Sequence, residues 1–89
     1  MRNVVFKARI KRDMKKMKRR GKDLEKLTAI ARILSSGAQL PARAQIHKLS
    51  GEYEGRWECH IEPDWLLIFD ISDDAVILFR TGSHADLFE

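Results

Sequence analysis

Residues 57–81 read WECHIEPDWLLIFDISDDAVILFRT, and this stretch decides the fold of the chain. At its beginning apolar and polar side chains alternate, with Trp57, Cys59 and Ile61 in the apolar positions. Successive side chains of a β-strand point to opposite faces of a sheet, so the alternation predicts a strand with one buried face. The polar side chains expected on its other face are Arg56, Glu58, His60 and Glu62.

Two further strands are predicted in the rest of this stretch. Residues 65–71 are apolar on both faces, which is typical of a strand in the middle of a sheet. Pro63 and Asp64 form a turn before it, residues 72–74 form a turn after it, and residues 75–81 form the next strand. Because both turns are short, the three strands should form an antiparallel meander.

The chain begins with a short strand and a basic helix. Residues 3–7 are rich in β-forming residues and predict the strand. Ile10, Met14 and Met17 then recur at the spacing of one helix face, while the other faces are almost all basic. Gly21 follows as the C-terminal cap, since glycine adopts positive φ without a steric penalty.

A second helix is predicted over residues 22–35. Gly37 ends it, and Pro41 prevents the helix from starting again. The turn between the two helices is so short that they should form an antiparallel hairpin whose apolar faces pack on a common sheet. The apolar residues of this second helix are Leu24, Leu27, Ile30, Ala31, Ile33 and Leu34.

These elements define an α+β fold with the order β-α-α-β-β-β. The helical hairpin should pack on one face of a four-stranded, mainly antiparallel sheet, within a single domain that spans residues 1–89. The opposite face of the sheet is expected to be open, and it is therefore the expected location of a functional site.

The composition is that of a globular protein, with 44% hydrophobic and 34% charged residues. The single cysteine, Cys59, excludes an intramolecular disulfide and favours a reducing compartment. The sequence shows no apolar run near the roughly 20 residues of a membrane helix and no signal-peptide pattern at its start. We therefore expect a cytoplasmic protein without a membrane partner.

The net charge of +4 conceals a strong asymmetry between the two halves of the chain. Residues 1–48 contain 15 Lys/Arg and three acidic residues, whereas residues 49–89 contain two Lys/Arg and ten acidic residues. So dense a basic segment favours contact with nucleic acid or the ribosome, although a solvated helix face or an acidic protein partner would also fit. The candidate RNA- and ribosome-binding residues are Lys11, Arg12, Lys15, Lys16, Lys18, Arg19, Arg20 and Lys48.

The candidate catalytic residues lie in the second half of the chain. His47, His60 and His84 are each expected at a strand end or in a loop beside the sheet, with Asp64 and Arg80 nearby. A lone histidine is more often structural, but three near one sheet edge suggest a functional site. Zinc is the main competing interpretation, yet separations of 13 and 24 residues match no common zinc pattern, and one cysteine adds little.

Acid–base cleavage of RNA needs these residue types. The ribose 2′-OH attacks the adjacent phosphate, so a base must accept its proton and an acid must protonate the leaving 5′ oxygen. Histidine can fill both roles because its unperturbed pKa lies near neutrality. Arg80 can stabilise the charge that grows on the phosphate, since a guanidinium stays protonated and presents parallel donors.

Three motifs resemble those of YafQ-type toxins in the RelE/ParE superfamily. The run HIEPDWLLI at residues 60–68 resembles the signature of that family, and RTGSHADLF at residues 80–88 resembles its C-terminus. The run HKLSG at residues 47–51 fits a third block in position and spacing. The resemblance covers essentially the whole chain and extends to the predicted order of elements.

The resemblance implies roles for the candidate catalytic residues. His47 matches the general base for the 2′-OH, His84 the general acid for the leaving oxygen, and Arg80 the residue that stabilises the scissile phosphate. An alternative for Arg80 is a structural ion pair with Glu62 or Asp86.

Three other motif positions are less directly tied to the chemistry. His60 and Asp64 match essential active-site positions that orient the substrate or share proton transfer, although Asp64 could also be a turn residue. Phe88 matches a C-terminal aromatic that supports the site or stacks on a base. Trp65 occupies a motif position too, but packing at the start of its strand is the better interpretation.

The sequence departs from the family pattern at two positions. Many relatives have proline after the first histidine, where this chain has Lys48, so the loop that aims His47 could be looser. Relatives also often have arginine directly before the acid that corresponds to Glu58, where this chain has Trp57. Arg56 lies one residue earlier, and a one-residue shift on a strand moves a side chain to the opposite face.

The resemblance implies a type II toxin that cuts translated mRNA on the ribosome by metal-free acid–base transesterification, without a cofactor. It implies ribosomal RNA and mRNA as partners, together with a cognate antitoxin and, through the antitoxin, operator DNA. The alternative within the superfamily is a ParE-like toxin that inhibits DNA gyrase by binding, but such proteins generally lack the three histidines. A plain RNA-binding module would leave the histidines unexplained.

Overall fold

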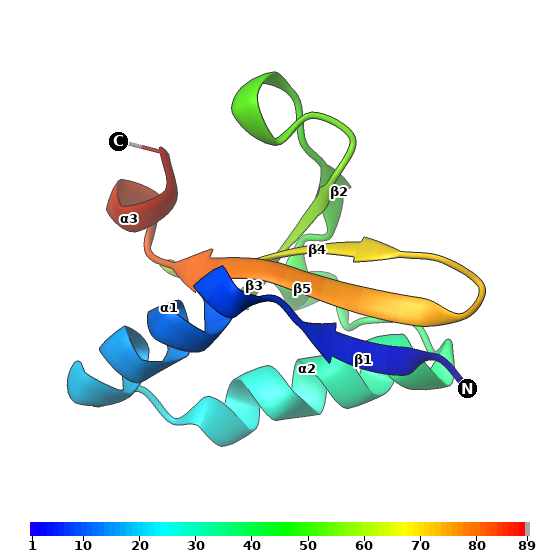
Figure 1. Cartoon of the computed structure of the whole chain (residues 1–89), viewed down its shortest axis with the longest axis horizontal. Coiled ribbons are helices and arrows are strands. Elements are labelled where there is room, and N and C mark those ends of the chain that lie inside the picture. Colours follow the sequence, from blue (N-terminus) through cyan, green and yellow to red (C-terminus); the bar gives the residue numbers. More distant parts are fainter. Residues whose placement is uncertain (89) are drawn as a thin grey trace.

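The computed structural model describes residues 1–88 and forms a sheet with helices on both sides (Figure 1). The strands are β1 (Asn3–Phe6), β2 (His47–Lys48), β3 (Trp57–Glu62), β4 (Trp65–Ile71) and β5 (Ala75–Gly82). The helices are α1 (Ala8–Arg19), α2 (Leu24–Ser36) and α3 (His84–Phe88), with short 3₁₀ turns at η1 (Ala42–Ala44) and η2 (Gly51–Tyr53).

The strand order is β1-β5-β4-β3-β2, with β1 parallel to β5 and the other neighbours antiparallel. The predicted α+β fold is confirmed, with two additions. The sheet has five strands rather than four, because His47 and Lys48 pair with β3 as a strand too short to show a period of its own. Residues 84–88, for which no element is predicted, form α3.

The main core lies between the sheet and the two long helices, which cover the same face (Figure 1). Ile10 and Met17 of α1 and Leu27 of α2 are buried there together with Phe69 of β4. The three helix residues among them are ones that the helical spacing places on the apolar faces. Full burial of each such side chain contributes roughly 1.5–3 kcal/mol, so this layer holds the hairpin on the sheet.

The opposite face of the sheet is partly covered, so the expectation that it is open is wrong in part. Leu66 and Ile68 of β4 pack there against Leu87 of α3, and all three are buried. This smaller cluster means that β4 is buried on both faces, as its continuous apolar sequence predicts. The cluster is completed by Leu49, Tyr53 and Phe79.

A β-bulge in β5 decides which way Arg80 points. Ile68 of β4 pairs with Arg80, whereas the next residue, Phe69, pairs with Leu78, so Phe79 is the extra residue. Without the bulge, Arg80 would share the helix-facing side with Leu78, because side chains of a strand alternate with a period of two. The bulge places Arg80 on the opposite face of the sheet instead.

A second bulge, in β3, overturns the predicted direction of Glu62. His60 pairs with Leu66 and Glu62 pairs with Trp65, so Ile61 is the extra residue. Simple alternation places Glu62 on the same face as His60. The extra residue turns Glu62 toward the helices, where the ammonium groups of two lysines bind its carboxylate.

The helix ends follow the local chemistry of the chain. Gly21 has φ of +85° and follows Arg20, the C-cap of α1, in the position where glycine commonly ends a helix. The second helix is predicted over residues 22–35 and runs from Leu24 to Ser36, with Asp23 as N-cap accepting a hydrogen bond from the Glu25 amide. Within residues 1–88, no helix is both long and apolar enough to span a bilayer.

Candidate active site

One row of paired residues crosses the sheet on the face away from α1 and α2. His47 pairs with Glu58, Glu58 pairs with Ile68, and Ile68 pairs with Arg80, so the row runs from β2 to β5. Residues paired directly across strands point to the same face. His60 follows Glu58 by two residues in β3 and joins this face. The sheet therefore gathers two imidazoles, a carboxylate and a guanidinium on one side.

Glu58 lies between two of the histidines and is almost fully buried. Its Oε1 lies 3.2 Å from His47 Nε2 and 3.8 Å from His60 Nε2. His47 Nδ1 is 3.0 Å from the carbonyl oxygen of Gln45, which can only accept, so Nδ1 is the donor there. Nε2 is then the atom that can take up a proton, and the adjacent carboxylate would stabilise the resulting imidazolium.

Asp64 holds His84 by two contacts at the start of α3. Asp64 Oδ1 lies 2.6 Å from His84 Nδ1 and accepts a hydrogen bond of 2.9 Å from the His84 amide. The backbone bond is the main cause that lowers the pKa of Asp64 from its ordinary value, and the side-chain bond adds to it. Asp64 thus remains a carboxylate at neutral pH and fixes the imidazole through Nδ1, while the His84 side chain is 54% exposed.

Aromatic rings connect the two histidines to the C-terminal helix. The His60 and His84 ring centroids are 5.8 Å apart, and those of His84 and Phe88 are 6.4 Å apart. Phe88 also meets Tyr53 edge-on at 5.6 Å. These contacts bring residues from β3, α3 and η2 into one continuous surface, with an exposed Phe88 at its edge.

Arg80 is bound on both sides. Its Nε donates to Asp13 Oδ2 at 2.7 Å, and its Nη1 donates to the Tyr53 hydroxyl at 3.3 Å. The Asp13 carboxylate is the main reason that the pKa of Arg80 is raised above its ordinary value. The alternative ion pairs with Glu62 and Asp86 are not formed, because those carboxylates bind other cations.

Asp86 binds two of the predicted ribosome-binding residues. Its carboxylate accepts hydrogen bonds of 2.6 and 3.0 Å from Arg20 and one of 3.2 Å from Lys16. The bond from the Arg20 guanidinium is the main cause that holds the pKa of Asp86 well below its usual range. In this structure Lys16 and Arg20 therefore tie α1 to α3.

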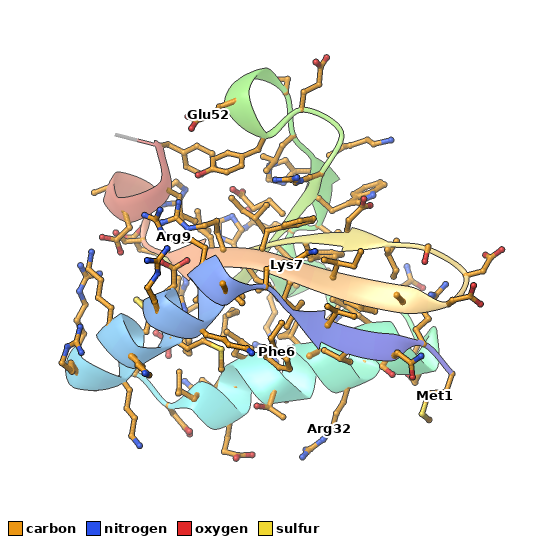
Figure 2. All side chains as sticks on the ribbon, viewed as in Figure 1. Met1, Phe6, Lys7, Arg9, Arg32 and Glu52 are labelled. Carbon is orange, nitrogen blue, oxygen red and sulfur yellow. The ribbon has the colours of Figure 1, made fainter. Side chains whose placement is uncertain are left out.

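The remaining predicted basic residues of α1 have exposed side chains; they are Lys11, Arg12, Lys15, Lys18 and Arg19. A cavity of about 480 Å³ lies between α1 and the end of β5. Its lining includes five cations, which are Arg9, Arg12, Lys16, Arg19 and Arg80. Figure 2 shows Arg9 near the beginning of α1, close to the end of β5. The basic helix face thus continues as far as Arg80.

The two departures from the family pattern have structural counterparts. Lys48 Nζ lies 5.5 Å from the centroid of the Trp57 ring, within cation–π range. Trp57 faces the main core, which leaves no phosphate contact from that position. The Arg56 guanidinium lies 3.7 Å from the centroid of the Phe79 ring and so stays beside the smaller cluster.

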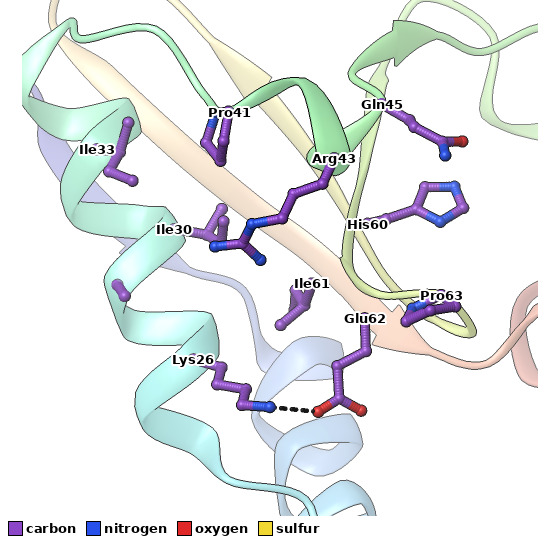
Figure 3. Close-up of a pocket in the computed structure, with 11 residues that line it drawn as sticks. Lys26, Ile30, Ile33, Pro41, Arg43, Gln45, His60, Ile61, Glu62 and Pro63 are labelled. Carbon is purple, nitrogen blue, oxygen red and sulfur yellow. Dashed lines mark hydrogen bonds and ion pairs between the residues drawn. The ribbon is translucent and has the colours of Figure 1, made fainter.

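A second cavity, of about 590 Å³, lies between α2, η1 and the end of β3 (Figure 3). Its apolar wall is formed by Ile30, Ile33 and Ile61, and Arg43 extends across it. Lys26 bonds Glu62 at 2.8 Å along its lower rim. His60 and Pro63 border the cavity at one end, so it adjoins the histidine site.

The described part of the chain contains no group of three or more His, Cys, Asp or Glu side chains placed to hold a metal ion. Cys59 is buried in the main core, and burial raises the pKa of its thiol to about 12. A thiol with so high a pKa is neither a nucleophile nor a metal ligand near neutral pH.

Three residues of the site are absent from the sequence-based prediction. Glu58 could have been found, because strand alternation places it on the face of His60 and strand pairing then puts it beside His47. Asp13 and Tyr53 could not, because their contacts with Arg80 span 67 and 27 residues of sequence. Only the packing of α1 and η2 around the end of β5 brings them there.

Comparison with known proteins gives the family. Residues 2–89 match the family model described as "Bacterial toxin of type II toxin-antitoxin system, YafQ". The mRNA interferase toxin YafQ of Escherichia coli strain K12 is 35% identical over 88 residues, which cover 98% of this chain and 96% of that protein. The corresponding protein of strain B / BL21-DE3 is 34% identical over the same length.

Solved structures agree with this result. The crystal structure of YafQ from E. coli strain BL21(DE3) has a TM-score of 0.92 and 32% identity, with full coverage of both chains. A crystal structure of the E. coli DinJ–YafQ toxin–antitoxin complex has a TM-score of 0.89 and 35% identity, covering 99% of this chain and 98% of that one. A metal-bound toxin from Helicobacter pylori has a TM-score of 0.90 and 30% identity, covering 99% and 100%.

The relatives confirm the predicted family and its endoribonuclease class, since the curated relatives are mRNA interferases. The match extends over nearly the whole chain in both sequence and fold. The chain therefore belongs to the YafQ family of bacterial toxins of type II toxin–antitoxin systems.

Proposed function

We propose that this chain is an mRNA interferase that cuts message on the ribosome by acid–base transesterification. The proposal rests on one observation: the same face of the molecule carries His47, His60, His84 and Arg80. A carboxylate lies beside His47, from Glu58, and another beside His84, from Asp64. Such a face can supply a base, an acid and a fixed cation to one phosphodiester.

The chemistry begins at the ribose next to the scissile bond. The 2′ oxygen attacks phosphorus while its proton passes to His47 Nε2, where Glu58 stabilises the imidazolium. The bond from phosphorus to the 5′ oxygen breaks, and that oxygen takes a proton from His84 Nε2. The products are a 2′,3′-cyclic phosphate and a free 5′-hydroxyl, and each histidine group contributes about 10²–10⁴-fold in rate.

Arg80 and His60 complete the proposed site. The Arg80 guanidinium neutralises the charge that develops on the phosphate oxygens. His60 lies between Glu58 and His84 and would orient the substrate or share the transferred proton. Phe88, exposed beside His84, is placed to stack on a base.

The proposed partners follow from charge and family. The exposed cations of α1, with Lys48, would bind ribosomal RNA, and the sheet face would receive the message. A type II toxin has a cognate antitoxin, and the E. coli relative is solved with DinJ. We propose that the antitoxin covers this toxin in the same way, that the pair binds operator DNA, and that both act in the cytoplasm.

The test is a primer-extension map of cleavage on translated and untranslated copies of one message. We expect cuts on the translated copy alone with the wild-type protein, and none with His84→Ala, although that variant still binds ribosomes. Cleavage of naked message would contradict ribosome dependence, and full activity of His84→Ala would remove the acid assignment.

A metal requirement is tested in the same assay. Because an H. pylori relative binds metal, zinc- and copper-specific chelators should be added while magnesium is kept for the ribosome. We expect unchanged cleavage. Loss of cleavage that returns when the removed metal is restored would show that the metal-free mechanism is wrong.

A further inference from the structure

Asp13 is the one acidic residue of α1, a helix that carries seven Lys/Arg. It points inward and is 7% exposed, whereas the cations around it are exposed. A buried carboxylate needs partners, since an unpaired buried charge is strongly destabilising. What Asp13 binds therefore indicates what the residue is for.

Asp13 binds the strand that carries the catalytic cation. Its Oδ2 accepts from Arg80 Nε at 2.7 Å and from the Thr81 amide at 3.2 Å, and its Oδ1 lies 3.4 Å from Arg80 Nη2. Strand β1 pairs with β5 only as far as Leu78. The carboxylate thus takes the place of a strand partner just beyond the bulge at Phe79.

The contacts on Arg80 leave a defined part of the guanidinium unused. Arginine has five N–H donors, of which Asp13 binds one on Nε and one on Nη2. The Tyr53 hydroxyl accepts one from Nη1. One N–H on each of Nη1 and Nη2 remains to donate to phosphate oxygens.

We propose that Asp13 is a positioning residue that aims Arg80 at the scissile phosphate. Helix α1 fixes the position of the Asp13 carboxylate, and this carboxylate fixes the plane of the Arg80 guanidinium. The Tyr53 hydroxyl limits rotation of the guanidinium from the other side. This inference rests on the proposed endoribonuclease function. It links the basic helix to the reaction, because the same α1 that presents cations to RNA also holds the catalytic arginine.

The test variant is Asp13→Asn, measured in the ribosome-dependent cleavage assay. An asparagine oxygen in the place of Oδ2 still accepts from the Thr81 amide and from Nε, but the negative charge is lost and the NH₂ group opposite Nη2 cannot accept a hydrogen bond. We expect kcat to fall at least tenfold, while KM for programmed ribosomes changes less than twofold. In the free protein, the NMR signal of the Arg80 Nε–H should shift and exchange faster with water.

Glu62→Gln is the matched control. Glu62 also joins a strand to the helices by ion pairs, with Lys22 at 2.7 Å and Lys26 at 2.8 Å, but it does not touch Arg80. The control should keep both kcat and the Arg80 Nε–H signal. A similar loss of kcat in Glu62→Gln would show that loosened helix packing, and not the aim of Arg80, causes the effect.

Wild-type protein and His84→Ala are measured in the same assay, so that failure of the proposed endoribonuclease function can be distinguished from failure of the positioning role of Asp13. If wild type cleaves, His84→Ala does not, and Asp13→Asn cleaves as fast as wild type, then only the positioning role is overturned. If the Arg80 Nε–H signal is unchanged in Asp13→Asn, the positioning role is overturned as well. If wild type itself does not cut message on ribosomes, the proposed function and this inference both fall.

Discussion

At the residue scale, His47 and His84 differ in which ring nitrogen lies against a carboxylate. Asp64 holds the Nδ1 atom of His84 and leaves Nε2 unbound, whereas Glu58 faces the Nε2 atom of His47 directly. A carboxylate at either ring nitrogen stabilises a protonated imidazole. The proposed roles of acid for His84 and base for His47 therefore rest on the family motifs.

The ion pairs of Glu62 give a prediction about acid stability. The Lys22 ammonium, followed by that of Lys26, lowers the pKa of Glu62 from 4.5 to about 2. Because the folded state has the lower pKa, the stabilisation is complete above pH 4.5 and is lost as the pH falls toward 2. Glu62→Gln should therefore lower the urea midpoint at pH 7, and its difference from wild type should vanish near pH 2.

The control for that titration is Glu52→Gln. Glu52 is exposed on η2, which stands apart from the sheet (Figure 2). Its urea midpoint should follow that of wild type at every pH. If the difference in urea midpoint between Glu62→Gln and wild type widened as the pH fell, the ion pairs would not explain the stabilisation.

At the scale of elements, two single-residue bulges shape the site. One turns Glu62 toward the helices, and the other takes Arg80 off the core-facing side occupied by Leu78, from where its guanidinium reaches Asp13 of α1. Each bulge reverses the alternation of everything that follows it on its strand. The site therefore depends on where the pairing slips, as well as on which residues the strands contain.

The end of α1 gives a second prediction. Gly21 has φ of +85°, and a Cβ added there would meet no atom within 4 Å, so the cost of a side chain is backbone strain alone. Gly21→Ala should reduce the free energy of unfolding by roughly 1–2 kcal/mol. Gly21→Asn should reduce the free energy of unfolding by less, since asparagine tolerates this conformation. If urea unfolding gave equal reductions for the two variants, backbone strain would not be the cause.

At the scale of the whole molecule, the basic surface adjoins the proposed catalytic face. The cations of α1 border a cavity that reaches Arg80, and the histidines lie on the sheet face beyond it. The acidic second half of the chain satisfies some of these cations, since Asp86 binds Lys16 and Arg20. The other cations of the helix are exposed, and they form the surface proposed to bind RNA.

The salt dependence of ribosome binding tests this surface. Replacing Lys11, Arg12 and Lys15 together by glutamine removes three cations, so the slope of log affinity against log salt should become shallower by about two to three. The measurement is ribosome binding of the catalytically inactive His84→Ala protein at several salt concentrations. The control is Arg32→Gln, on α2 and directed away from the sheet (Figure 2), which should leave the slope unchanged. An unchanged slope in the triple variant would show that these three residues of α1 do not contact the ribosome.

The sequence by itself determined the layers of this protein. Helical spacing identified the buried faces of α1 and α2, and alternation in residues 57–61 placed His60 opposite Cys59, because these patterns are local and repeat with the geometry of the backbone. The family motifs named His47, His60, Asp64, Arg80, His84 and Phe88, which the structure brings to one surface, while their catalytic roles stay predictions.

Only the tertiary structure decided how that surface is built. A two-residue β2 has no period to detect, and a bulge is a matter of pairing between strands, so neither the fifth strand nor the directions of Glu62 and Arg80 follow from local pattern. Asp13 reads in the sequence as one acid in a basic helix. Its partner lies 67 residues away, and contacts of that range are fixed by packing alone.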